Sequence, residues 1–402
     1  MSMHQSPSNG PREGLAEAGL RPLIRNLETD NIADLATKAN AMGDVVRLWY
    51  GEGDIVTPPF IREAAAASMN AGDTFYVPDM RGRAELVAAL ARYQTTLHGR
   101  PIGEDRSTVT PGGMQAVHLA MMLVCDPGQN VVYVEPQWPN IRHAITLAGG
   151  RPIAVGLDMT VHRPRLDLDR LFAACDESTA AICFSSPCNP TGWTASADEL
   201  AAILDFARAR GIWVISDEVY NRLWFGNEAA APSMMRLAEP EDRVLTVNSF
   251  SKAWAMTGWR VGWLGHPPSI QPVLSAVTQY VNSGTAAFVQ AGAAAALKEG
   301  EPLVAEIRER CRSGLDAAYE ILSEIPSVHL PEKPLGGIYA FFRLEGEDDS
   351  RAACRRILEE AKVGLAPGFM FGEAARPFLR MCVFRDTGTV REAAGRIAAA
   401  LR

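Results

Sequence analysis

Between about residues 60 and 290, short β-rich runs alternate with helical stretches, and this alternation limits the possible folds more than any other feature. The runs are STVT (107–110), VVYV (131–134), PIAV (152–155), AAICFS (180–185), IWVIS (212–216), RVLTVN (243–248) and RVGWL (260–264). Helices between successive strands make most strand pairs parallel and cover both faces of the sheet. We therefore predict an α/β domain with a largely parallel sheet.

One helix between these runs carries its own start and stop signals. Ser196 and Glu199 have the spacing of a capping box, and Gly211 can end the helix. Apolar residues recur between them at helical spacing. The sequence predicts a helix from just after Ser196 to just before Gly211.

Beyond residue 290 the pattern changes to long amphipathic helices and two further β-rich runs. The stretch 301–325 has helical spacing, GGIYAFFRL (336–344) and FLRMCVF (378–384) are strand-like, and a last helix follows. We expect a large domain over residues 58–290. A smaller α+β domain would combine residues 1–57 with 291–402, and the first dozen residues would form a loose tail.

Charge and cysteine content exclude several classes of function. The 402-residue chain has a formal net charge of -8, whereas binding to nucleic acid phosphates requires a basic face. Seven scattered cysteines without a CxxC pair indicate neither a disulfide framework nor a zinc ribbon. No apolar stretch is long enough to span a membrane, and no signal peptide is apparent. We expect a cytoplasmic protein that acts on small molecules.

Several predicted strands end in polar side chains, and open α/β sheets bind ligands at such ends. The ends carry a carboxylate, a phenol, an amide, two hydroxyls and an amine: Asp217, Tyr220, Asn189, Ser249, Ser251 and Lys252. After STVT, a Gly-Gly turn opens a helix whose free backbone N–H groups form an anion site. Because lysine is costly to desolvate, its place among these groups indicates a chemical role.

Pyridoxal 5'-phosphate (PLP) would use all of these groups. It needs an attachment lysine, an acid for its pyridine nitrogen, donors to its phenolic oxygen and a phosphate anchor. From YGEGDIVTPP (50–59) to FLRMCVF, the motifs resemble those of the class I/II aminotransferases, especially the bacterial aspartate and aromatic branch. The resemblance implies fold type I: a large domain with a mixed, mostly parallel seven-stranded sheet between helices, and a smaller α+β domain from both termini.

The resemblance also implies the cofactor contacts. Lys252 matches the family's Schiff-base lysine, and Asp217 matches the partner of the pyridine nitrogen. Asn189 and Tyr220 match the donors to the phenolic oxygen, and Trp138 in EPQWPN takes the ring-stacking position. The implied phosphate contacts are the amides of Gly113 and Met114, the side chains of Ser249, Ser251 and Arg260, and Tyr76 acting on the neighbouring subunit.

For the substrate, the resemblance implies that Arg380 binds the α-carboxylate, assisted by the Gly51 amide, with Tyr50 and Asn189 also in contact. The reaction would be a ping-pong transamination between an L-amino acid and a 2-oxo acid, in which Lys252 moves the proton. Shared active sites would require a homodimer. No metal, nucleic acid or membrane partner is expected.

At one position the chain departs from many bacterial aspartate enzymes, which have a lysine after the Gly-Gly turn where this chain has Met114. That lysine can meet a distal carboxylate. The residues expected to line the side-chain pocket are apolar or aromatic: Trp49, Tyr50, Phe369, Met370 and Phe371. We expect neutral or aromatic donors to be preferred over aspartate, although these residues could instead pack in the core.

Three alternatives stay open. An arginine elsewhere, including one from a second subunit, could restore an aspartate/glutamate-type specificity. A PLP-dependent carbon–sulfur lyase, or a relative of the aminocyclopropane-carboxylate synthases, would use the same fold and would release its product without an oxo-acid acceptor. A transcription regulator with this fold would need a basic recognition helix, and the roughly 50 residues before the first motif lack one.

Overall fold

In the computed structural model of the chain, the described residues are 19–25, 27, 33–160 and 162–402. The predicted loose tail lies outside them. The larger sheet has seven strands in the order β2-β8-β7-β6-β5-β3-β4. They are β2 (Ser107–Thr110), β3 (Asn130–Glu135), β4 (Arg151–Gly156), β5 (Thr179–Ser185), β6 (Trp213–Asp217), β7 (Val244–Ser249) and β8 (Gly262–Gly265).

The strand directions confirm a mixed, mostly parallel sheet. β8 is antiparallel to both β2 and β7, and the remaining neighbours pair in parallel. Each strand coincides with one of the predicted β-rich runs. The β-branched and aromatic residues of these runs favour a pleated, buried surface.

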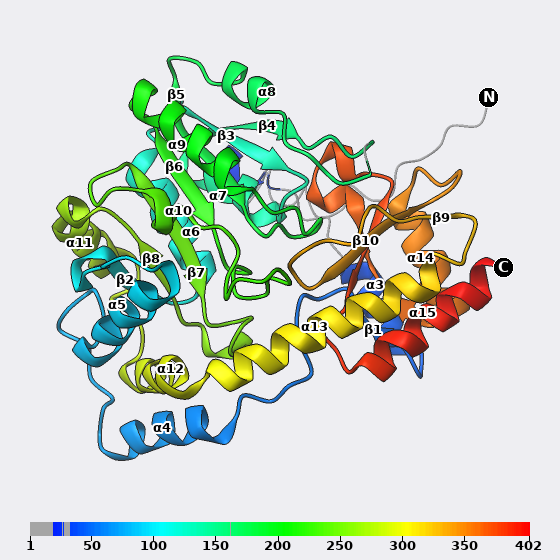
Figure 1. Ribbon diagram of the computed structural model, residues 1–402, viewed down its shortest axis with the longest axis horizontal. Coiled ribbons are helices and arrows are strands. Elements are labelled where there is room, and N and C mark those ends of the chain that lie inside the picture. Colours follow the sequence, from blue (N-terminus) through cyan, green and yellow to red (C-terminus); the bar gives the residue numbers. More distant parts are fainter. Residues whose placement is uncertain (1–18, 26, 28–32, 161) are drawn as a thin grey trace.

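Helices cover both faces of this sheet (Figure 1). Successive side chains of a strand point to opposite faces. Accordingly, Val132 and Val134 pack in one buried cluster with α9, while Val131 and Tyr133 pack in another with α6 and α7. The helices of this part are α4 (Pro59–Asn70), α5 (Ala84–His98), α6 (Gly113–Val124), α7 (Pro139–Ala148), α8 (Leu168–Ala173), α9 (Ala197–Arg210), α10 (Met234–Leu237), α11 (Gln271–Val281) and α12 (Ala287–Glu299).

Helix α9 confirms the capping prediction in atomic detail. The Ser196 hydroxyl accepts a hydrogen bond from the Glu199 amide at 3.1 Å. The Glu199 carboxylate in turn accepts one from the Ser196 amide at 2.7 Å. Gly211 ends the helix in the left-handed conformation with φ 66°.

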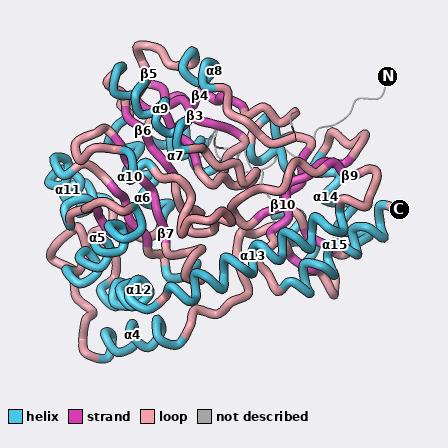
Figure 2. The backbone as a smooth tube through the Cα atoms, in the orientation of Figure 1, coloured by secondary structure: helices cyan, strands magenta, loops and turns pink. Residues whose placement is uncertain are grey.

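A second, smaller sheet lies beside the first, with the order β12-β13-β10-β9 and antiparallel pairing (Figure 2). Its strands are β9 (Val328–His329), β10 (Tyr339–Leu344), β12 (Ala366–Pro367) and β13 (Phe378–Cys382). Around it lie α3 (Ala33–Ala41), α13 (Glu301–Leu322), α14 (Ser350–Ala361), α15 (Thr387–Leu401) and the parallel pair β1 (Val46–Arg47) and β11 (Val363–Gly364). The short helix α2 (Pro22–Arg25) instead contacts α7 of the larger domain. Short 3₁₀ turns are η1 (Glu104–Arg106), η2 (Thr257–Trp259), η3 (Pro268–Ile270), η4 (Gly368–Phe371) and η5 (Glu373–Ala375).

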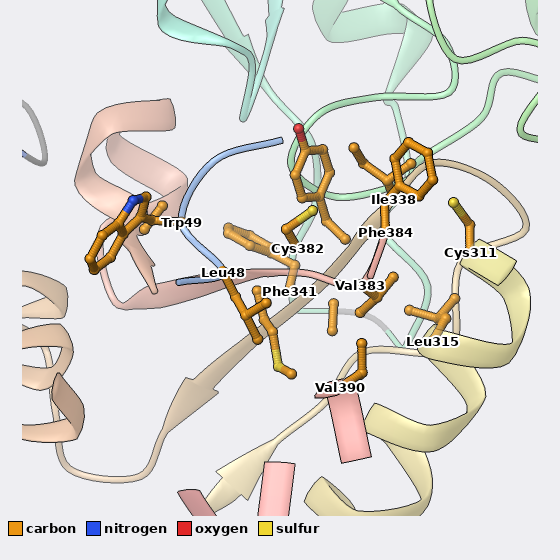
Figure 3. Close-up of a cluster of buried hydrophobic side chains, with 14 of the residues drawn as sticks. Leu48, Trp49, Cys311, Leu315, Ile338, Phe341, Cys382, Val383, Phe384 and Val390 are labelled. Carbon is orange, nitrogen blue, oxygen red and sulfur yellow. The ribbon is translucent and has the colours of Figure 1, made fainter. Parts of the chain in front are cut away.

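The core of this second part joins segments that are far apart in the sequence. Figure 3 shows Leu48, Val383 and Val390 in one buried cluster, with Cys311 and Leu315 coming from α13. Segment 46–47 pairs with 363–364, so the chain before residue 57 packs with the C-terminal third. The division into a large domain of residues 58–290 and a small domain of residues 1–57 and 291–402 stays a proposal. Its boundary between residues 290 and 291 falls inside α12, and this helix packs on α4 and α5 of the large domain.

Within the described residues, no helix combines the length and apolar character needed to cross a membrane.

Candidate active site

A cavity of about 520 Å³ opens at the carboxyl ends of the larger sheet, facing the smaller one. The residues predicted for the site from the sequence that line it are Tyr50, Gly51, Gly113, Met114, Trp138, Asn189, Asp217, Tyr220, Ser249, Ser251, Lys252, Arg260 and Arg380. The structure does not bring Tyr76 to them. That side chain is 82% exposed in the loop between α4 and α5.

The N-terminus of α6 makes one end of the cavity an anion-binding site. Its first residues are capped by no side chain, so their N–H groups stay free. Gly112 has φ 84° and lies so close to Arg260 that an added Cβ would be 2.3 Å from the guanidinium. A Cβ at Gly113 would likewise be 3.3 Å from that of Ser249. Two glycines therefore allow a cation and a hydroxyl to meet the free amides.

Two serines complete this end. The Ser249 hydroxyl donates to the Ser251 hydroxyl at 2.8 Å and accepts from the Ser251 amide at 3.1 Å. Arg260 itself has φ 54°, a left-handed conformation that is strained for a non-glycine residue, and it donates to the Thr257 carbonyl at 2.7 Å. Strain of this kind persists where the surrounding structure fixes the residue, often at functional sites.

Asp217 ends β6 and is 5% exposed. Burial raises the pKa of its carboxyl group to about 6, against smaller opposing effects of the Val219 amide and Lys252. The Val219 amide donates to this carboxylate at 3.1 Å. A cation placed beside Asp217 would lower its pKa again, so the position suits a positively charged ligand atom.

Lys252 lies partly buried and donates a hydrogen bond to the Gly51 carbonyl at 2.5 Å. The pKa of this amine is lowered to about 8, mainly by burial. The charges of Arg380 and Arg260 act in the same direction, and Cys382 and Glu52 act in the opposite one. An amine with such a pKa has a substantial neutral fraction near neutral pH. It can therefore act as a nucleophile and as a base.

Arg380 extends from β13 of the smaller sheet into the cavity. It donates to the Asn189 side-chain oxygen at 2.8 Å and to the Trp49 carbonyl. Its guanidinium lies 4.3 Å from the ring centre of Tyr339 and 4.7 Å from that of Phe371. Its Nε atom is buried without a hydrogen-bond partner in the described chain. This buried, incompletely paired cation indicates an anionic ligand.

Tyr339 is a site residue that the sequence analysis did not single out. Its hydroxyl lies 3.0 Å from that of Tyr220, and burial raises the pKa values of both phenols, so both stay neutral. A Cβ at Gly51 would be 1.9 Å from this hydroxyl, which explains why position 51 needs a glycine. The run GGIYAFFRL predicted the strand, but nothing local to it predicted which residue would face the cavity.

Of the residues expected to form the pocket wall, Phe369 does not line the cavity, and Trp49 lines it without exposing its ring. The ring of Trp49 is 1% exposed and packs on Gly364, where a Cβ would be 2.0 Å from it, so Trp49 offers the cavity its carbonyl instead. Phe369 is not among the lining residues, and Arg351 lies 4.6 Å over its ring. The apolar and aromatic wall includes Tyr50, Met114, Trp138, Val219, Met370 and Phe371.

Comparison with known proteins places the chain in a family. Residues 44–397 match the family model described as aminotransferase class I and II. The chain is 33% identical over 339 residues to an aspartate aminotransferase of Streptomyces avermitilis, with 82% of each chain covered. The structure matches aspartate aminotransferase from Thermotoga maritima with TM-score 0.87 and 30% identity, covering 94% of this chain and 99% of that one. It also matches aromatic aminotransferase from Pyrococcus horikoshii with TM-score 0.82 and 31% identity, covering 91% of this chain and 98% of that one.

The fold is thus that of the PLP-dependent enzymes of fold type I. The chain belongs to the class I and II aminotransferases, and it is a PLP-dependent transaminase that acts on an amino acid and a 2-oxo acid. The relatives are named for more than one substrate, so the donor is a separate question.

The cavity fits this cofactor. The glycine-lined anion site can take a phosphate, because added Cβ atoms at Gly112 and Gly113 would displace or crowd the side chains that complete it. At the other end, the buried Asp217 suits a protonated pyridine nitrogen, and Lys252 is an available amine.

Proposed function

We propose that this transaminase takes neutral or aromatic L-amino acids as donors and a 2-oxo acid as acceptor. The charges of the cavity carry the proposal. Its cationic lining residues within the described chain are Lys252, Arg260 and Arg380. The cofactor and the α-carboxylate of the substrate would occupy all three. A second carboxylate on the donor would therefore meet the apolar wall around Met114 without a counter-charge.

In this proposal, the amine of Lys252 holds the cofactor covalently, and the amides of Gly113 and Met114 bind its phosphate with Ser249, Ser251 and Arg260. Asp217 faces the pyridine nitrogen. Trp138 and Val219, both lining residues, would cover the two faces of the ring. Tyr220 and the amide N–H groups of Asn189 would donate to the phenolic oxygen, since the oxygen of Asn189 already accepts from Arg380.

When bound, PLP acts as an electron sink that stabilises negative charge at the Cα of the donor. The protein residues position the donor and move its proton. Arg380 binds the α-carboxylate, which fixes the Cα–H bond relative to Lys252. Once the amino group of the donor has replaced it on the cofactor, the Lys252 amine, with its pKa lowered to about 8, would take the proton from Cα and deliver it on the far side of the donor nitrogen. Asp217, with a pKa of about 6, is mainly ionised at neutral pH.

A donor panel with 2-oxoglutarate and pyruvate as acceptors tests the specificity. We expect kcat/KM for phenylalanine, methionine, leucine or alanine to exceed that for aspartate by about ten- to hundredfold, because an unpaired buried carboxylate loses a charge-assisted hydrogen bond of about 1.5 to 3 kcal/mol. The variant Met114→Lys should narrow this ratio at least about tenfold.

Met122→Lys is the matched control, because Met122 lies on the same helix with 51% of its surface exposed and outside the cavity. If wild-type enzyme prefers aspartate, the specificity proposal fails and a dicarboxylate-type enzyme is supported. Release of pyruvate and ammonia without an acceptor would instead support a lyase.

We also propose a homodimer with shared active sites, since Phe75 and Tyr76 are adjacent and 83% and 82% exposed. Nearby, Val56 and Met69 border a mainly apolar cavity of about 610 Å³ that also touches Thr257, five residues from Lys252. Exposed apolar side chains gathered next to an active site are typical of a protein–protein interface. A partner's Tyr76 would then reach the phosphate.

Sedimentation of wild-type enzyme should show a dimer, and Phe75→Glu should weaken it at least tenfold, with activity falling in proportion to the monomer fraction. Leu147→Glu, at a 37% exposed apolar residue on α7, should leave the dimer intact. A fully active monomer would refute shared sites.

A reducing, cytoplasmic location is part of the proposal. All seven cysteines are free and buried, so none of them needs an oxidising compartment for a disulfide.

A further inference from the structure

A second cavity, of about 300 Å³, lies where residues 331–337 cross the larger domain. We call residues 331–337 the crossing segment. It contributes Glu332, Pro334 and Leu335 to the wall. The opposite wall comes from the loop 163–165, the turn 191–194 and Trp224. Cavities of this size accommodate small ligands, and this one shares no lining residue with the active site.

Both carboxylates of this cavity already have hydrogen-bond partners, while one guanidinium has none within the described chain. Glu332 forms an ion pair with Arg163 at 2.5 Å, and Glu199 closes the capping box of α9. The exposed Arg165 guanidinium has no ion pair or hydrogen bond within the described chain. The Arg165 guanidinium is therefore free to bind an anionic group.

Two tryptophans line this cavity. Trp193 is 6% exposed and Trp224 is partly buried. Neither indole N–H donates a hydrogen bond to the described residues. Pro164 and Pro334 complete the apolar surface. Tryptophan and proline surfaces bind planar rings, and a free indole N–H or a guanidinium can hydrogen-bond a carboxylate.

We infer that this cavity binds a small aromatic carboxylate, with its ring against Trp224 and its carboxylate on Arg165. The site is separate from the donor site and does not depend on the donor specificity proposed above.

The crossing segment joins this cavity to the active site. A Cβ at Gly192 would lie 2.4 Å from Pro334 and 2.7 Å from the Gly336 carbonyl, so the turn and the segment are in direct contact. The Gly337 amide donates to the Leu223 carbonyl at 2.9 Å. Asn189 precedes the turn by two residues, and Tyr339 follows the segment by two. A bound ligand therefore contacts the two chain segments that carry these active-site residues.

Calorimetric titration of holoenzyme with indole-3-acetate tests the inference. Because the active site could also bind this anion through Arg380, the titration uses the Arg380→Ala holoenzyme, in which that contact is removed. We expect it to bind about one equivalent per chain. Adding Arg165→Gln should weaken binding at least about tenfold, through the loss of a charge-assisted contact.

The matched control adds Arg170→Gln to Arg380→Ala instead. Arg170 is an exposed arginine of α8, five residues along the chain and outside the cavity. This control should bind as tightly as the Arg380→Ala parent. The inference is overturned if the Arg380→Ala parent does not bind indole-3-acetate. It is also overturned if the parent and the variant that adds Arg165→Gln bind it equally tightly. Trp224→Leu provides a second variant and should weaken binding through the loss of ring contact.

Discussion

Replacing Lys252 with alanine should reduce turnover by a factor on the order of 10⁴ or more, because it removes both the attachment amine and the group that moves the proton. The protein should remain folded and still hold PLP noncovalently. The α6 amides, Ser249 and Arg260 do not depend on the lysine side chain for their positions, since they contact one another. Steady-state assays and the visible absorbance of bound cofactor measure the two results separately.

Borohydride treatment gives an independent check. Reduction should fix PLP to wild-type chain on the peptide that contains Lys252, and it should fix none to the variant. Lys298→Ala is the control, because Lys298 is an exposed lysine of α12 whose side chain is 79% accessible. If the Lys252→Ala protein still retains reduced cofactor covalently, another lysine is the attachment site and the assignment is wrong.

Replacing Asp217 with asparagine should lower kcat by about a hundredfold or more, while it stabilises the protein without cofactor. The activity loss follows from removing the buried charge opposite a pyridine nitrogen, which costs about 3 to 5 kcal/mol. The stability gain follows from the carboxyl pKa, which burial raises from 3.8 to about 6. Each pKa unit corresponds to 1.36 kcal/mol, so ionised Asp217 costs the apoprotein about 3 kcal/mol.

The pH dependence fixes the sign of this effect. A carboxyl group whose pKa is higher in the folded state favours folding below its unfolded pKa, and this contribution is lost as the pH rises through the folded value. The difference in unfolding free energy between Asp217→Asn and wild-type apoprotein should therefore grow by about 2 kcal/mol between pH 4 and pH 7. Urea unfolding at several pH values measures it, with the exposed Asp348→Asn as control. A difference that does not change with pH would refute this account of Asp217.

The sequence by itself determined the local structure and the order of the motifs. The seven β-rich runs became the seven strands of the larger sheet, and the capping box at Ser196 started α9. These features depend on neighbouring residues: β-branched residues favour strands, and a serine three positions before a glutamate satisfies helix N–H groups. The carboxyl ends of parallel strands lie at one edge, so Asp217, Asn189 and Lys252 could be expected to lie together.

Only the tertiary structure decided which way certain side chains point and what surrounds them. Trp49 packs its ring on Gly364 and offers Arg380 a carbonyl, whereas its place beside Gly51 in the sequence suggested a wall of the pocket. Tyr339 reaches Tyr220 across 119 positions of sequence. Such contacts, and the burial that shifts the pKa values of Asp217 and Lys252, depend on segments brought together from distant parts of the chain. Local sequence patterns carry no information about them, because the free energy of burial depends on all the residues that pack around a group.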